Sequence, residues 1–161
     1  AHPSRGWDIL MHSMDGEREP REFLATEFNE NHPRFSPDGH WVAYDSDETG
    51  QREVYVKPYA DSRASVRVST EGGYFPVWAP SGRELFYRDG PRMMAVAIAT
   101  EPALSAGPPR LLFEGSYLSR YDISPDGERF LMIREPKTEP ITQLNVVFNW
   151  FAELNRLVPV D

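Results

Sequence analysis

Five residues suited to molecular recognition, two arginines and three tyrosines, fall close to segments that are typical of strands. Aromatic side chains are enriched at the recognition surfaces of proteins. Tyrosines near strand ends, with arginines beside them, are therefore candidates for contact with a partner. We predict a binding face that contains Arg34, Tyr74, Tyr117, Arg120 and Tyr121. Trp78 directly precedes a turn, where packing between sheets is the favoured role.

The sequence lacks the motifs that are typical of hydrolytic catalysis. Serine hydrolysis needs a nucleophile on a tight elbow, a histidine and an acid. The segment EGSYLSR (114–120) lacks the second glycine of that elbow, and all four histidines lie in the first 40 residues. Glycoside hydrolysis needs two carboxylates at a fixed separation, and among 25 acidic residues no pair stands out by position. We predict no catalytic residue.

The candidate for a metal site is the segment DSDETG (45–50), because oxygens at alternate positions are typical of a calcium loop. A loop of the EF-hand type has glutamate at its twelfth position, which is Val56 here. A calcium site of another type stays open, although a polar hairpin loop explains the same residues. The chain has no cysteine, which removes zinc sites built on thiolates. We predict neither a metal nor a cofactor.

Asp38 and Asp126 occupy the same place in two similar segments, RFSPDGHWVAY (34–44) and DISPDGERFLM (122–132). One interpretation is a ring of carboxylates on one face, suited to cations or basic peptide groups. The other is that each aspartate closes its own turn by bonding back to the backbone. The second interpretation is favoured.

These segments belong to a repeat with three copies, and VWAPSGRELFY (77–87) lies between the other two. The turn prolines Pro37, Pro80 and Pro125 recur at intervals of 43 and 45 residues. Proline sets the first corner of each turn and glycine adopts the positive φ, so each turn links two strands tightly. An interval of about 40–45 residues is the length of one four-stranded propeller blade.

The repeat predicts an all-β chain built from propeller blades of four antiparallel strands. We expect one partial propeller with blades at 6–26 (partial), 32–70, 74–115 and 118–148, and a short terminal helix at 149–158. Within them, the patterns predict strands at 6–16, 20–26, 53–59, 65–70, 92–100, 110–115 and 141–148. The segment 101–109 is rich in proline and small residues and predicts a loop. In such a fold the predicted tyrosines lie in connections leading to innermost strands, near the central channel.

Composition narrows the class of partner. With 161 residues, 40% of them hydrophobic, the chain can form one domain with a core. The net charge of −8 repels phosphate backbones, so we expect no nucleic acid. No apolar run approaches the length of a membrane span, and we expect no membrane contact. The first ten residues lack the pattern of a signal peptide, and we expect a piece of a longer protein.

The segment RFSPDGHWVAYDSDETGQREVYVKPY (34–59) resembles the TolB-like β-propeller repeat, a WD-repeat-like bacterial module. In that repeat an S-P-D-G turn links two strands, and a Ser- or Asp-rich loop ending in glycine precedes an I/V-Y-V strand. Ser46, Gly50 and the strand 54–56 match those places, whereas Ser81 replaces the turn aspartate in the second copy. The end, 144–159, is similar to bacterial multidomain proteins in which such a propeller follows a kinase or DNA-binding domain and a membrane span.

The resemblance implies a non-catalytic scaffold for protein or peptide binding, the sensor part of a larger bacterial protein in a periplasmic or extracytoplasmic location. The alternative is a propeller cap or accessory part of a hydrolase (peptidase, esterase or glycosidase), because similar propellers also precede peptidase domains. Three blades and a fraction are fewer than the usual 4–8 of a closed ring. We therefore expect a homodimer that completes the ring.

Overall fold

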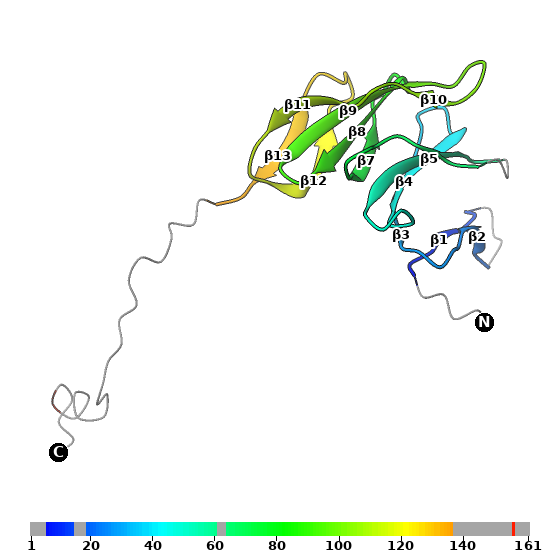
Figure 1. The fold of residues 1–161 in the computed structure, drawn as a ribbon, viewed down its shortest axis with the longest axis horizontal. Helices are drawn as coiled ribbons and strands as arrows, with labels where there is room; N and C mark the ends of the chain where they lie inside the picture. The colour runs from blue at the N-terminus through cyan, green and yellow to red at the C-terminus, as the bar shows by residue number, and fades with distance from the viewer. Residues whose placement is uncertain (1–5, 15–18, 61–63, 137–155, 157–161) are drawn as a thin grey trace.

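The computed structural model describes residues 6–14, 19–60, 64–136 and 156. Within them the chain forms 13 strands in four antiparallel sheets, which follow one another in sequence order along the molecule (Figure 1). The all-β fold built from propeller blades is thus confirmed. The helix expected at 149–158 lies outside the described residues except for Arg156, which is helical. In the described part, no helix has the length and hydropathy needed to cross a membrane.

The first two sheets come from the N-terminal half of the chain. The first is a hairpin of two short strands, β1 (Ile9–Met11) and β2 (Arg21–Leu24). The second has four strands in sequence order, β3 (Glu30–Phe35), β4 (Trp41–Ser46), β5 (Glu53–Pro58) and β6 (Val66–Arg67). This order is that of one meandering blade.

The third and fourth sheets follow the same plan with one departure. The third contains β7 (Tyr74–Trp78), β8 (Glu84–Asp89), β9 (Arg92–Ala99), β10 (Ser105–Ala106) and β11 (Arg110–Glu114), and the fourth contains β12 (Tyr117–Ile123) and β13 (Phe130–Arg134). Both β10 and β11 pair with β9. The prediction of a loop throughout 101–109 is therefore wrong, because Leu104 and Ala106 pack against the core and hold β10 beside β9. The strand expected at 141–148 lies outside the described residues.

The repeated turn joins the first two strands of each of the last three sheets. Gly39, Gly82 and Gly127 adopt φ values of 74°, 69° and 76°. Asp38 accepts hydrogen bonds from the Ser36 hydroxyl (2.5 Å) and the His40 amide (3.0 Å), and Asp126 does the same in the last turn. These bonds hold the pKa of both carboxyls below the usual range. Each aspartate closes its own turn, as the favoured interpretation predicted.

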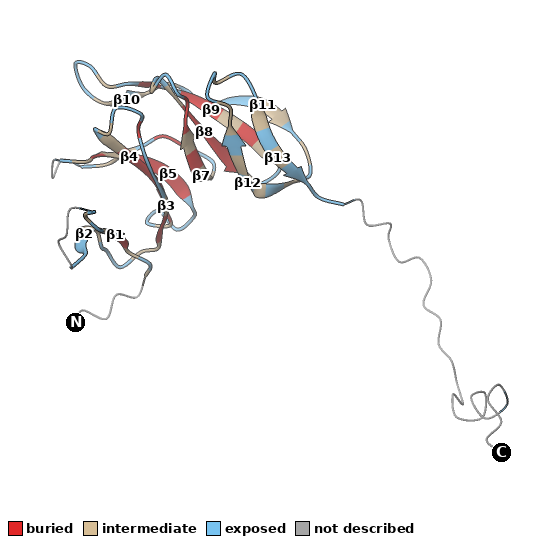
Figure 2. Cartoon of the chain, turned by 180° about the vertical axis from the view of Figure 1, so that it is seen from behind, coloured by how far each residue is buried: buried red, intermediate tan, exposed pale blue. Residues whose placement is uncertain are grey.

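The core lies between the sheets rather than inside any one of them. One cluster joins the second and third sheets, and a second joins the third and fourth (Figure 2). Trp78 is 5% exposed in the first cluster, and its indole nitrogen donates to the carbonyl of Arg34 at 3.2 Å. Its predicted packing role is confirmed. The third sheet is covered on both faces, which explains the apolar run in β9.

Candidate functional site

The innermost strands of three successive sheets, β3, β7 and β12, place equivalent residues around one cavity. β7 packs between β3 and β12. The residue five positions before each turn proline is His32, Phe75 or Arg120, and all three line a cavity of about 350 Å³. The rest of its lining is Arg34, Pro76, Val77 and Tyr121. We call this cavity the inner-strand groove.

Three of the five predicted binding residues meet in the inner-strand groove: Arg34, Arg120 and Tyr121. The other two lie elsewhere, since the Tyr74 hydroxyl donates to the Gly90 carbonyl at 3.4 Å and the Tyr117 ring packs edge-on against Phe113. The sequence predicted that the tyrosines lie in connections, and this prediction is wrong. All three belong to β7 or β12, because their backbones pair with β8 or β13.

His32 and Phe75 also line the groove, although neither is predicted from the sequence. Their rings lie together with centroids 3.7 Å apart. Both have positive φ, 51° and 55°, which is uncommon for residues other than glycine and marks strained backbone. Alignment of the copies on the turn proline is the signal that could have found them, because it places both residues at one repeat position.

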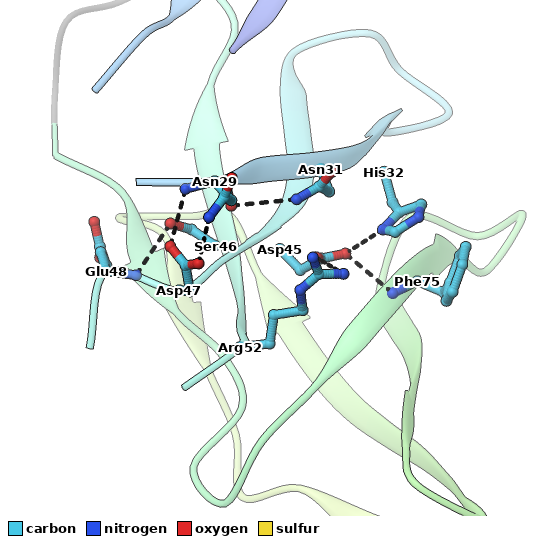
Figure 3. Close-up of polar contacts among 9 residues, drawn as sticks. All are labelled: Asn29, Asn31, His32, Asp45, Ser46, Asp47, Glu48, Arg52 and Phe75. Carbon is cyan, nitrogen blue, oxygen red and sulfur yellow. Dashed lines mark hydrogen bonds and ion pairs between the residues drawn. The ribbon is translucent and has the colours of Figure 1, made fainter. Parts of the chain in front are cut away.

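Asp45 bonds to both members of this strained pair (Figure 3). Its buried Oδ1 atom lies 2.7 Å from Nδ1 of His32 and accepts the Phe75 amide at 3.2 Å. Arg52 Nη1 lies 3.6 Å from Oδ2, an ion pair too long for a hydrogen bond. Burial raises the pKa of the Asp45 carboxyl, while His32, the Phe75 amide and Arg52 oppose the rise. Because Phe75 belongs to the next blade, Asp45 ties two blades together.

A second carboxylate of the calcium-like segment, Asp47, also binds protein donors. Asp47 accepts the Asn29 amide at 2.9 Å and the Asn29 side-chain nitrogen at 2.6 Å (Figure 3). These bonds lower the pKa of Asp47. Across the residues that the structure describes, no group of three or more histidine or acidic side chains is arranged to hold a metal ion. Asp45 and Asp47 of this segment therefore both bind protein donors.

The inner-strand groove is positively charged and partly aromatic. Arg34 and Arg120 are exposed, and neither forms an ion pair with the described residues. The Tyr121 hydroxyl donates to the Phe75 carbonyl at 2.9 Å, and burial raises the pKa of Tyr121 although Arg88 and Arg34 oppose the shift. Such an arrangement can bind an anionic group against an aromatic wall.

Two further hollows differ in kind. One of about 420 Å³ adjoins the inner-strand groove and shares Arg34, Val77 and Tyr121 with it, which extends the groove toward Trp78. The other, of about 630 Å³, lies between β2 and the end of β5 and includes Lys57 and Tyr59. Although larger, it borders the edge of a two-stranded sheet and contains no residues that the repeat brings together. We therefore place the candidate site in the inner-strand groove.

Comparisons with known proteins agree with the observed architecture. No family model matches the sequence. An uncharacterized protein of Agrobacterium fabrum is 27% identical over 140 residues, which are 80% of this chain and 47% of that protein. This chain therefore spans about half the length of that relative.

Two solved structures share the fold. A candidate TolB from Agrobacterium tumefaciens superimposes with a TM-score of 0.57 at 22% identity, covering 80% of this chain and 50% of that one. A candidate 6-phosphogluconolactonase from Bacteroides uniformis gives a TM-score of 0.53 at 19% identity, covering 76% and 39%. Likeness at these identities describes the fold and not the activity. The described residues of this chain have the TolB-like β-propeller fold.

Proposed function

We propose that the chain is a non-catalytic propeller scaffold that binds a segment of a protein or peptide in the inner-strand groove. The observation that carries the proposal is the convergence of His32, Phe75 and Arg120 from three successive blades on one cavity. Arg34 and Arg120 offer exposed donors, and Phe75 and Tyr121 offer half-buried aromatic surface. Arginine and tyrosine dominate the energetics of many interfaces.

Preorganisation supports binding at this place. The Asp45 contacts hold His32 and Phe75 in positive-φ conformations before any partner arrives. A groove that does not reorganise loses less entropy when it binds. Strained backbone persists where the surrounding structure imposes it, and it clusters at binding sites.

The proposal extends to assembly and location. We propose a single partial propeller, the sensor part of a larger extracytoplasmic protein, whose ring is completed by a second copy. Exposed apolar side chains on the last described sheet support a covering partner: Leu118, Leu131 and Ile133 are 45%, 76% and 58% exposed. Light scattering of the whole chain tests the assembly, and a stable monomer at high concentration argues against it.

A groove-filling substitution tests the binding function. Val77 is half-buried and lines both parts of the groove, so Val77→Trp fills it. Val66→Trp, at a half-buried position in the outer strand β6, is the matched control. Peptides selected on the immobilised chain from a random display library should lose affinity for Val77→Trp and keep it for Val66→Trp.

Circular dichroism establishes that both variants are folded. If the library yields no peptide, or if filling the groove leaves affinity unchanged, the proposed function is wrong. The same chain tested against ester, peptide and glycoside substrates separates this function from the hydrolase alternative, because turnover by the isolated chain contradicts a non-catalytic scaffold.

A further inference from the structure

Arg88 on β8 is a buried cation without an acidic partner among the described residues. It is 1% exposed, and its Nη2 donates to the Gly90 carbonyl at 2.9 Å. Its Nε and Nη1 atoms have no hydrogen-bond partner within the described part of the chain. A buried charge of this kind is unfavourable unless another group compensates for it.

The repeat shows what Arg88 replaces. Arg88 lies eight residues after its turn proline, and the residue at that position in the preceding blade is Asp45. Both side chains are buried in the second strand of their blades. Asp45 is compensated by His32, Arg52 and the Phe75 amide. At this repeat position, one blade has a buried anion with three partners, and the next has a buried cation without an acidic partner among the described residues.

Arg88 lies on the strand next to β7, which lines the inner-strand groove. Its backbone pairs with Tyr74, the residue that precedes Phe75 in β7. Arg88 and Arg34 both oppose the rise in the pKa of Tyr121, which lines the groove. The exposed Arg34 and Arg120 and the enclosed Arg88 therefore place three positive charges around one tyrosine, in a chain whose net charge is −8.

We propose that the inner-strand groove recognises a carboxylate group of its peptide partner. This inference rests on the proposed peptide-binding function and names the chemistry that the groove selects. Arg34 and Arg120 donate to the carboxylate oxygens, because arginine presents paired donors to that planar group. Arg88 does not touch the ligand. It raises the positive potential from a site of low dielectric constant, where a charge is weakly screened.

The carboxylate can come from an acidic side chain or from the C-terminus of a peptide, and three probes distinguish these sources. They are unlabelled, N-acetylated octapeptides of one Gly-Ser-Tyr sequence: one with an internal glutamate and an amidated end, one with glutamine and a free carboxylate, and one with glutamine and an amidated end. Isothermal titration calorimetry with the whole chain measures their dissociation constants. We expect at least one carboxylate peptide to bind about tenfold or more tightly than the neutral one.

Variants assign this preference to the three arginines. Arg34→Gln and Arg120→Gln should each weaken carboxylate binding by about tenfold, and Arg67→Gln, a charge change on the outer strand β6, should leave it unchanged. Arg88→Met should reduce the preference for the carboxylate peptide by about threefold to tenfold while the neutral peptide binds as before. Arg88→Lys should restore the preference, because it keeps the charge. Thermal unfolding of every variant confirms that the fold is intact.

Each result decides between the two proposals. If the neutral peptide binds as tightly as the others, and Val77→Trp abolishes that binding, peptide binding stands and carboxylate recognition is overturned. If no octapeptide binds and the display library also fails, both proposals fall. Inorganic phosphate that binds the chain while both carboxylate peptides do not also overturns the inference. A preference that survives Arg34→Gln and Arg120→Gln together places the recognition outside the groove and overturns it as well.

Discussion

The first three strands of the second and third sheets follow the same order, and they carry opposite charges at one buried position. In the second sheet Asp45 accepts the amide of Phe75 from the next blade and contacts His32. In the third sheet Arg88 has a hydrogen bond to Gly90 and two nitrogens without described partners. A repeat keeps the backbone constant, so the side chain at each copy is free to serve packing in one blade and recognition in another.

We expect the largest effect from substitution of Asp45, the buried charge that has partners. Asp45→Ala leaves His32 and the Phe75 amide without their acceptor in a buried place and should lower the free energy of unfolding by about 3 kcal/mol. Urea unfolding followed by tryptophan fluorescence measures the loss. Asp45→Asn keeps an acceptor oxygen and should lose less. Equal stability of Asp45→Ala and the unmodified chain would show that Asp45 does not tie the blades.

Substitution of Arg88 should change the free energy of unfolding in the opposite direction. Arg88→Met removes a buried charge that has no acidic partner in the described chain, and should raise the free energy of unfolding by about 1 kcal/mol. The same urea experiment measures the change. A loss as large as that of Asp45→Ala would mean that Arg88 is a structural residue with a compensating partner. That result would remove the contrast between the two sheets.

Two carboxylates in one hairpin should give opposite pH dependences. The pKa of Asp45 is raised from 3.8 by burial, so its contribution to stability is full below pH 3.8 and decreases as the pH rises through the raised value. The pKa of Asp47 is lowered from 3.8 by its bonds to Asn29, so its contribution is present above pH 3.8 and is lost as the pH falls through the lowered value.

Unfolding of Asp45→Asn and Asp47→Asn at several pH values separates these contributions. The loss of unfolding free energy caused by Asp47→Asn should become smaller as the pH falls below 3.8. As the pH rises above 3.8, the unfolding free energy of Asp45→Asn should increase relative to that of the unmodified chain. Parallel curves for the two variants would contradict the assignment of burial to one carboxylate and hydrogen bonding to the other.

The smallest effect concerns the turn of the third sheet. Ser81 replaces the turn aspartate there, and Ala79 replaces the serine that bonds to that aspartate in the other two turns. Ser81→Asp should raise the free energy of unfolding by no more than about 0.5 kcal/mol, because Ser81 already accepts the Arg83 amide at 3.3 Å and the turn lacks the serine partner. The double substitution Ala79→Ser with Ser81→Asp tests whether the serine-to-aspartate hydrogen bond of the other two turns adds further stability.

Local features were predictable because their causes are local. A proline, an aspartate and a glycine within four residues encode a turn, and Asp38 and Asp126 close their turns as expected. β9 was predicted from its apolar run, and Trp78 from its place before a turn. β10 was missed because its pairing depends on Leu104 and Ala106 reaching the core between two sheets, which no local propensity encodes.

The candidate site was predictable in part for the same reason. Arg34, Arg120 and Tyr121 were selected by residue type, and the structure places them together. Tyr74 and Tyr117 have the same residue chemistry but lie away from the groove. His32 and Phe75 carried no signal by type, since their role comes from backbone conformation and from a carboxylate in another strand.

By itself the sequence determined the turns, the strand period and the propeller fold, since these follow from residues close together in the chain. The tertiary structure decided which side chains face each other across blades. It brought Asp45 into contact with two strained residues and left Arg88 enclosed in the next blade. Burial and charge compensation depend on neighbours that are distant in sequence. They contribute to stability only when the blades have packed against one another.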